Sequence, residues 1–280
     1  MSDGEGTDGW FVGTTSFPSE QAIENYRTGS ADVPKRWPTI AVSAGHFADQ
    51  SEYYRALHQT AIAATREAVS EHAAASDVQV IHKVRAADDL GRVANELAER
   101  VIAWGAETNV EFEPTLAGVL ELADESTHRN SHAGVYELAD TISTLHDQQS
   151  ALHTAIENEM QSLAPNLSAI AGELLGARLI ALAGGLKNLA RSTSGTVQVL
   201  GAEDALFAHL RNGSPPPKHG IIFTHEYVRG TSPSQRGSAA RALAGKLTIA
   251  ARIDYYSGER NTTIERELAE RIETIRERES

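Results

Sequence analysis

Residues 135–163, VYELADTISTLHDQQSALHTAIENEMQSL, place apolar side chains at alternating steps of three and four. That spacing puts them on one face of a helix and is typical of the seam of a coiled coil. Polar Gln149 and Glu159 interrupt the seam, and polar groups at such positions fix the register of paired helices. The seam pairs either two copies of the chain or two helices of one chain. Its core residues are Leu138, Ile142, Leu145, Leu152 and Ile156.

Helical patterns continue on both sides of this segment. Upstream, helices are expected over residues 51–75, 77–106 and 114–125, with a short strand at Val78–Ile81 as an alternative. Downstream, a new helix begins at Pro165 and weakens at Gly184-Gly185. Further helices are expected over residues 202–211, 233–256 and 262–279.

The first 50 residues are the least regular part of the chain. Trp10–Val12 and Ile40–Val42 are candidate strands, separated by turns that contain proline and glycine. The sequence therefore predicts a mainly α fold with four parts. These are a small N-terminal α/β region at residues 1–76, a helical coiled-coil region at 77–164, an all-α domain at 165–258, and a charged C-terminal helix at 259–280.

The composition excludes several classes of protein. The chain has no cysteine, which rules out disulfides, thiolate catalysis and cysteine-based zinc sites. It has no apolar run of about 18 residues, the length that would predict a membrane span. The first ten residues are acidic and glycine-rich, unlike a signal peptide. We therefore expect a cytoplasmic protein with no membrane partner.

The charge is unevenly distributed. The net charge is −13, and only five of the 25 basic residues are lysines, a composition that indicates a high-salt cytoplasm. Residues 165–258 nevertheless hold ten Lys and Arg against five Asp and Glu, a net charge of +5, whereas the rest of the chain carries −18. A basic segment within an acidic chain is typical of a phosphate-binding surface, with chance clustering as the alternative.

Sequence motifs for catalysis or metal binding are weak. Gly4–Gly9 matches the dinucleotide pattern G-x-G-x-x-G, but it lacks the preceding strand and the following helix that hold a pyrophosphate. His128 and His132 are spaced for one helix face, yet the spacing fixes no third metal ligand, so a solvated turn is expected. His219 and His225 lie in the basic segment and either stack on bases or pack internally.

The basic segment suits contact with the backbone of structured RNA. On an ideal helix Arg241 and Lys246 lie about 140° apart, so they flank a groove. Arg229 and Arg236 lie at or before the start of that helix, where free amide groups also favour phosphate. Lys187 and Arg191, four residues apart, share one face of an earlier helix. A solvated helix face is the alternative.

Several long runs resemble the Nop domain of the core subunit of archaeal box C/D guide ribonucleoproteins. The runs cover about a third of the chain and are APNLSAIAGELLGARLI at 164–180, GLKNLA at 185–190, VLGAEDALF at 199–207, QRG at 235–237 and AARIDYY at 250–256. Weaker similarity extends from AADDL at 86–90 to Trp104. The resemblance identifies residues 165–258 as a Nop domain.

The resemblance implies a scaffold that catalyses nothing and needs neither cofactor nor metal. Its Nop domain would clasp a kink-turn RNA and a small kink-turn-binding protein, its coiled coil would pair two copies as a homodimer, and its N-terminal domain would hold a fibrillarin-type methyltransferase. The residues expected to face RNA are Lys187, Arg191, Arg229, Gln235, Arg236, Arg241 and Lys246. Those expected to meet the small protein and the neighbouring RNA are Gly201, Ala202, Glu203, Leu206 and Phe207.

The chain also departs from the family pattern. Asp204 and Ser238 stand where relatives usually carry basic residues, and both the coiled-coil region and the N-terminal domain look short. These differences fit a shortened paralogue with changed partners. Two rival functions therefore stand beside the box C/D scaffold. One is a fibrillarin-independent assembly factor or chaperone for ribosomal RNA, and the other is a metal-dependent hydrolase that uses the histidines.

Overall fold

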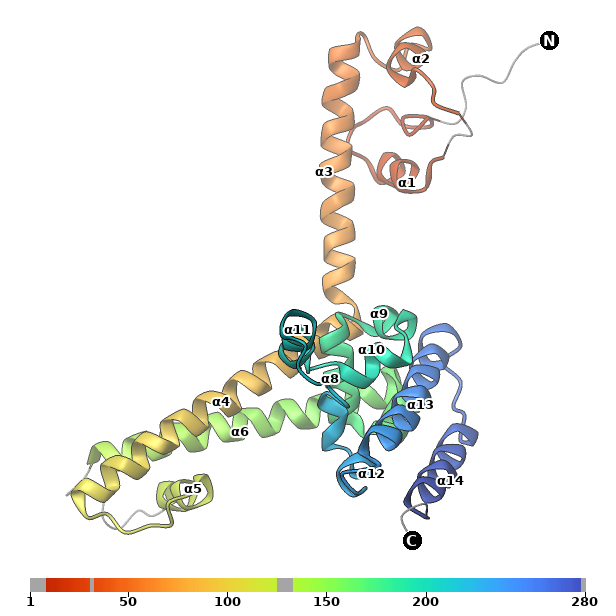
Figure 1. The fold of residues 1–280 in the computed structure, drawn as a ribbon. Coiled ribbons are helices and arrows are strands. Elements are labelled where there is room, and N and C mark those ends of the chain that lie inside the picture. Colours follow the sequence, from red (N-terminus) through yellow and green to blue (C-terminus); the bar gives the residue numbers. More distant parts are fainter. Residues whose placement is uncertain (1–8, 31–32, 125–132, 278–280) are drawn as a thin grey trace. The chain divides into compact units, whose positions relative to one another are not determined.

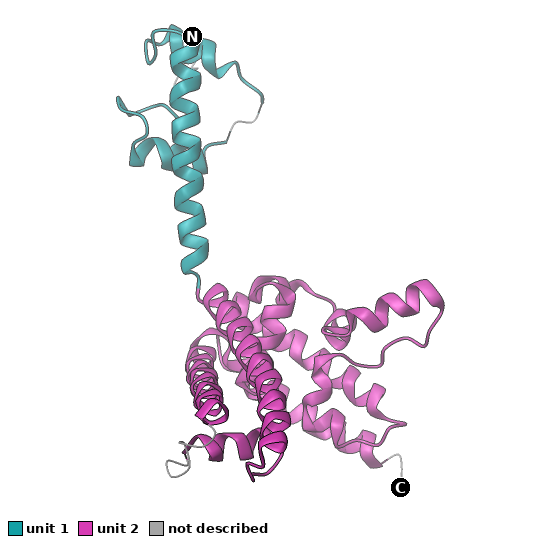
Figure 2. Ribbon diagram, turned by 90° about the vertical axis from the view of Figure 1, so that its left-hand side faces the viewer, with its two compact units in different colours: residues 1–75 teal, residues 76–280 magenta. Residues whose placement is uncertain are grey.

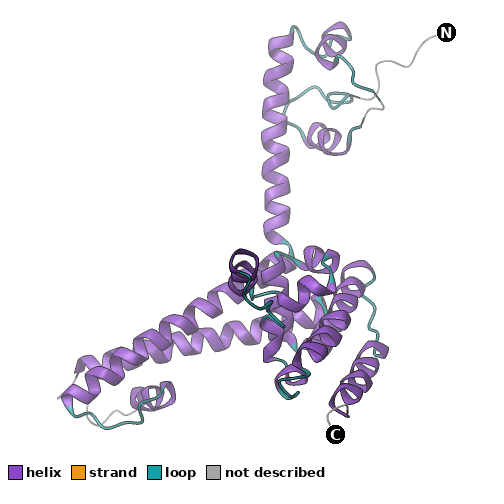
Figure 3. Ribbon diagram, in the orientation of Figure 1, coloured by secondary structure: helices purple, strands orange, loops and turns teal. Residues whose placement is uncertain are grey.

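The structure is a computed structural model that describes residues 9–30, 33–124 and 133–277. Over these ranges every regular element is a helix and no strand forms (Figure 3). The mainly α fold expected from the apolar periodicity is therefore confirmed. The chain divides into two compact units, residues 1–75 and residues 76–280 (Figure 2). Apolar side chains of the described residues gather in one core in the first unit and in two cores in the second.

The first unit packs three helices around an aromatic core. The helices are α1 (Glu20–Thr28), α2 (Trp37–Ser43) and α3 (Gln50–Ala74). Trp10, Phe11, Phe47 and Tyr53 are buried in this core. The indole Nε1 of Trp10 donates a hydrogen bond to the Tyr53 hydroxyl at 3.1 Å. This bond satisfies the one polar atom that the indole brings into the core.

The strands expected in this unit are wrong. Ile40–Val42 lie inside α2, where Pro38 occupies the first turn, a position at which a missing N–H costs the helix nothing. Trp10–Val12 form turns, in which the amide of Val12 donates to the carbonyl of Gly9 at 3.0 Å. Each apolar run is three residues long and has no neighbouring strand among the described residues, so turns and helices satisfy its backbone groups instead.

The second unit begins with a helical hairpin. Helix α4 (Ser76–Thr108) and helix α6 (Ala133–Leu163) run antiparallel, and α5 (Leu116–Asp124) packs near the tip (Figure 1). Val78–Ile81 lie within α4, so the alternative of a strand there is wrong. The expected seam on α6 faces α4 of the same chain: Ile142 and Ile156 are buried, and Leu138, Leu145 and Leu152 are half-buried. Pairing with a second copy stays a prediction.

Both polar interruptions of the seam find partners on α4. Gln149 Nε2 donates to the carbonyl oxygen of Ala87 at 3.1 Å, and Glu159 forms an ion pair with Lys83. Gly91 leaves room for the amide group, because a Cβ at that position would overlap Gln149. A slip of either helix would leave these polar groups unpaired, so the two contacts fix the register of the hairpin.

The rest of the second unit is a bundle built around α13 (Arg236–Tyr256). Its other elements are α7 (Pro165–Ala171), α8 (Glu173–Ala183), α9 (Leu186–Arg191), α10 (Ser194–Val199), α11 (Glu203–Asn212), the 3-10 turn η1 (Ile221–Thr224), α12 (Glu226–Arg229) and α14 (Thr263–Glu277). Helices α7, α9, α10, α12 and α14 all pack against α13. Small side chains on α13 permit this close approach, and the buried alanines are Ala239, Ala240, Ala244, Ala250 and Ala251.

The helix expected from Pro165 is broken twice. The break expected at Gly184-Gly185 is present, because Gly184 adopts a left-handed φ of 74° and ends α8. A further break occurs at Gly172, whose φ is 76°, and there the axes of α7 and α8 bend by 115°. No single helix among the described residues is long and apolar enough to cross a membrane, although α7 and α8 taken together pass that test of length and composition.

Candidate functional site

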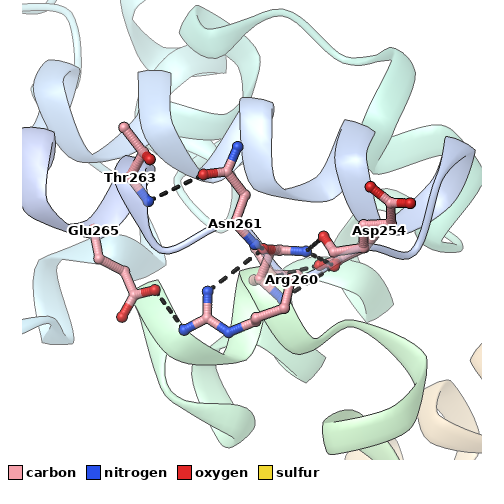
Figure 4. Close-up of polar contacts among 8 residues, drawn as sticks. Asp254, Arg260, Asn261, Thr263 and Glu265 are labelled. Atoms are coloured by element: carbon pink, nitrogen blue, oxygen red, sulfur yellow. Dashed lines mark hydrogen bonds and ion pairs between the residues drawn. The ribbon is translucent and has the colours of Figure 1, made fainter.

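A buried carboxylate joins two of the runs quoted above. Asp254 of α13 is 8% exposed and accepts hydrogen bonds from the amides of Asn166 (3.0 Å) and Leu167 (2.8 Å), in the first turn of α7. The side-chain amide of Asn166 also donates to Asp254, at 2.7 Å, and its oxygen accepts from the amide of Asn261 at 2.7 Å (Figure 4). Asp254 therefore caps a helix that lies nearly 90 residues earlier in the chain.

The turn before α13 is held from two sides by arginines. Arg236 Nε donates to the carbonyl of Thr231 at 3.1 Å, and its guanidinium lies 5.3 Å from the ring centre of Phe223. From α14, Arg276 Nε reaches the hydroxyl of Thr231 at 3.4 Å, and its guanidinium lies 5.9 Å from the ring centre of Tyr227. Arg236 is consequently half-buried and fixed in place.

The predicted RNA-facing residues differ in their surroundings. Lys187 and Arg191 on α9, Arg229 on α12 and Arg241 on α13 are exposed, and none of them forms an ion pair with a described residue. Lys246 instead pairs with Glu267 of α14 at 2.5 Å. Gln235 is half-buried at the N-cap of α13. Four of the seven predicted residues thus carry an exposed positive charge without an ion pair among the described residues, and they lie on α9, α12 and α13.

Two arginines that sequence reasoning did not assign fix these elements. Arg252 of α13 donates through Nε to the carbonyl of Ala190 (3.0 Å) and through a terminal nitrogen to that of Ser192 (3.3 Å). A cation at these carbonyls satisfies the C-terminal end of α9, the helix that carries Lys187 and Arg191. Arg252 lies in a quoted run, which was a usable signal. Arg276 lies in the segment for which the sequence predicted only a charged C-terminal helix.

Helix α11 and the two residues before it carry the side chains expected to meet a small protein. Gly201 adopts a φ of 79° and its amide donates to the carboxylate of Glu203 at 2.9 Å. All ten residues of α11, each of them described, are half-buried or exposed. Phe207 is 56% exposed and Leu210 is 69% exposed, whereas Ala202 and Leu206 are half-buried. An apolar surface of this kind on a helix is suited to a protein partner.

The two histidines of the basic segment differ in their contacts. His225 Nε2 lies 2.9 Å from the carbonyl oxygen of Ile170, and Nδ1 accepts from the amide of Tyr227 at 3.1 Å. With both ring nitrogens used, His225 is an internal packing residue that links α12 to α7. Burial lowers its pKa, which keeps this arrangement neutral. His219 lies instead against the ring of Phe223, at 4.6 Å between ring centres.

Residues 9–30, 33–124 and 133–277 contain no group of three or more histidine, aspartate or glutamate side chains placed to hold a metal ion. His128, His132 and Gly4–Asp8 lie outside the described residues.

Comparison with known proteins places the chain in a family. Residues 61–277 match the family model described as Nop, snoRNA binding domain, fibrillarin. An uncharacterised NOP5 family protein of Methanocaldococcus jannaschii is 34% identical over 274 residues, which cover 85% of this chain and 66% of that protein. Human nucleolar protein 56 is 39% identical over 139 residues, which cover 50% of this chain and 23% of that protein.

A solved structure described as a fibrillarin/Nop5p complex contains a similar chain. The TM-score is 0.55 at 26% identity, and the match covers 96% of this chain and 99% of that one. The present chain thus spans just under two thirds of the archaeal relative and about a quarter of the human one. Since the family model matches more than half of the sequence, the chain belongs to the Nop family.

Proposed function

We propose that this chain is a non-catalytic RNA-binding scaffold of a box C/D-type ribonucleoprotein. Its Nop domain clamps a kink-turn RNA that a small kink-turn-binding protein already holds, and the assembly positions a fibrillarin-type methyltransferase for guided 2′-O-methylation. The observation that carries the proposal is that four of the residues expected to face RNA are exposed and form no ion pair with another described residue: Lys187, Arg191, Arg229 and Arg241. They lie within the matched family segment and within the basic part of an otherwise acidic chain.

The fixed framework around these cations supports a shape-reading clamp. The composition indicates a high-salt cytoplasm. At an ionic strength of 1 M the Debye length is about 3 Å, so the long-range attraction between the protein and RNA is screened. Counterion release then contributes little, and affinity must come from close contacts on a preorganised surface. Asp254, Arg252 and Arg276 supply such preorganisation through contacts within the bundle.

The small protein is assigned to α11. Phe207 and Leu210 are exposed there, and burying them against a partner would remove apolar surface from water. Asp204, exposed on the same helix, repels phosphate rather than attracting it. The helix therefore suits contact with a protein better than contact with the RNA backbone.

Methyltransferase positioning is supported by the description of the similar solved structure as a fibrillarin/Nop5p complex. A fibrillarin-independent assembly factor is the second candidate. It is favoured by the helical first unit, whose described residues lack the α/β character expected of a methyltransferase-binding domain. Purification of the full chain from cells separates the two, because only the first function requires that fibrillarin copurify with it.

The clamp is tested by measuring the affinity of the full chain for a kink-turn RNA, with and without its small binding protein. We expect weak binding to the bare RNA and clear binding to the RNA–protein complex. Arg241→Ala should weaken that binding by about 1–3 kcal/mol, the range for one charge-assisted contact. The control is Arg271→Ala on α14, which removes an exposed cation from outside the basic segment.

Arg276 is unsuitable as a control, because it contacts Thr231 beside Arg236. Equal losses for Arg241→Ala and Arg271→Ala would indicate a diffuse charge effect and would overturn the clamp. Tight binding to bare RNA at high salt would contradict the requirement for a preformed complex.

A further inference from the structure

Three side chains form a stack at the edge of α13. The imidazole of His219 lies over the ring of Phe223 with 4.6 Å between ring centres and 20° between planes. The guanidinium of Arg236 lies 5.3 Å from the centre of the same Phe223 ring. His219 and Phe223 are half-buried, and Phe223 is the one aromatic ring of the described residues that packs on His219. The imidazole therefore still has surface that a further planar group can cover.

The segment that carries His219 is fixed to α10. The backbone carbonyl of Gln198 accepts a hydrogen bond from the amide of Gly220 at 2.8 Å. The side-chain Nε2 of Gln198 donates to the backbone carbonyl of Lys218 at 2.7 Å. The amide of Ile221 donates to the carbonyl of Leu200 at 2.7 Å. A Cβ at Gly220 would overlap that carbonyl, so glycine is needed for this close approach. His219 is consequently held between two anchored neighbours, and little further ordering is required for it to bind a planar group.

The positive charge around the stack lies on the neighbours of the His219 ring and not on the ring itself. Lys218 is exposed, and its Cδ lies 3.9 Å from the position of a Cβ at Gly237 in the first turn of α13. Burial, then the positive charges of Arg236 and Lys218, lower the pKa of His219. At neutral pH the imidazole is therefore an uncharged aromatic surface, and the positive charge beside it resides on Lys218 and Arg236.

We propose that the His219–Phe223–Arg236 stack is a platform for one unpaired base of the bound RNA, with Lys218 contacting the adjacent phosphate. This inference rests on the proposed RNA-binding function and names the part of the RNA that this site takes. Aromatic side chains accept any base by stacking, which is how proteins bind splayed-out bases in RNA. Stacking does not depend on long-range charge, so salt weakens it much less than it weakens phosphate contacts.

The test uses the full chain with a kink-turn RNA held by its small binding protein. 2-Aminopurine replaces each unpaired base of the RNA in turn, because its fluorescence is quenched when it stacks. We expect quenching at one position with the unaltered chain. His219→Ala should abolish that quenching and weaken binding about tenfold, with the same dependence of affinity on salt. His219→Phe keeps a ring and should restore both, whereas His58→Ala, which removes an exposed histidine from α3, should change neither.

Lys218→Ala provides the complementary measurement. This variant should leave the quenching in place. It should reduce the steepness of log affinity plotted against log salt concentration by about one, the change expected when one phosphate contact is lost. If His219→Ala leaves quenching and affinity unchanged while Arg241→Ala still weakens binding, the stacking platform is overturned and the RNA clamp stands. If the unaltered chain binds no RNA at all, both are overturned.

Discussion

Replacing Asp254 by alanine should loosen the junction between α7 and α13. The change removes the acceptor for the amides of Asn166 and Leu167 in a buried site, whereas the Asn166 side chain keeps a bond to the carbonyl of Glu259 at 2.8 Å. Each buried amide left without a partner costs about 1–3 kcal/mol, so the loss of two amounts to about 4 kcal/mol. The matched control is Glu259→Ala, which removes an exposed carboxylate five residues away and retains that carbonyl.

The assay is hydrogen exchange at the two amides, read against the amide of Ile23 in the other unit, which donates to Ser19 at 2.9 Å. A loss of about 4 kcal/mol corresponds to faster exchange by nearly three orders of magnitude, since about 1.4 kcal/mol is a factor of ten. Asp254→Asn retains one carbonyl oxygen and should lie between alanine and the unaltered chain. Unchanged exchange in Asp254→Ala would refute the reasoning that this carboxylate caps α7.

Two further outcomes are expected. Changing Leu145 and Leu152 to glutamate should reduce helicity and should lower stability by several kcal/mol, roughly the cost of placing charges against α4. Circular dichroism with light scattering measures both the fold and the oligomeric state. A fully folded variant that only changes from dimer to monomer would show that the seam pairs two chains. Burial lowers the pKa of His225, so the stability that its neutral form contributes is present above the ordinary pKa of 6.5 and is lost as pH falls below 6.5. The urea midpoint of the unaltered chain should therefore fall between pH 7 and pH 5, and it should fall less in His225→Asn. Equal falls in His225→Asn and in the control His58→Asn would contradict this prediction.

The long helices were predictable because burial imposes a period on the sequence. The seam of α6 repeats at steps of three and four, and the structure buries that face against α4. Gln149 and Glu159 were expected to fix register, and both pair with α4. The break at Gly172 was not foreseen, because a single glycine within an apolar run is compatible with a continuous helix until the bundle requires a positive φ there.

The candidate site was only partly predictable, because sequence places a cation on a helix without revealing its partner. Arg241 and Lys246 are five residues apart on α13, yet Arg241 is exposed while Lys246 pairs with Glu267 of α14. The sequence did not distinguish His219 from His225. In the structure His219 contacts Phe223, four residues away, whereas His225 contacts Ile170, 55 residues earlier in the chain. The short apolar runs of the first unit misled for a related reason, since an aromatic core rather than a sheet buries them.

The capping of α7 by Asp254 also has a consequence for how the protein is made. A ribosome adds about 5–20 residues per second, so α7 waits roughly 4–18 seconds before Asp254, 88 residues later, has been synthesised. During that interval the first turn of α7 has only water to accept from its free amides, and the apolar α7–α8 segment has no α13 to pack against. The bundle therefore closes only after Asp254 has been synthesised, and until then the nascent chain displays apolar surface that the folded bundle hides.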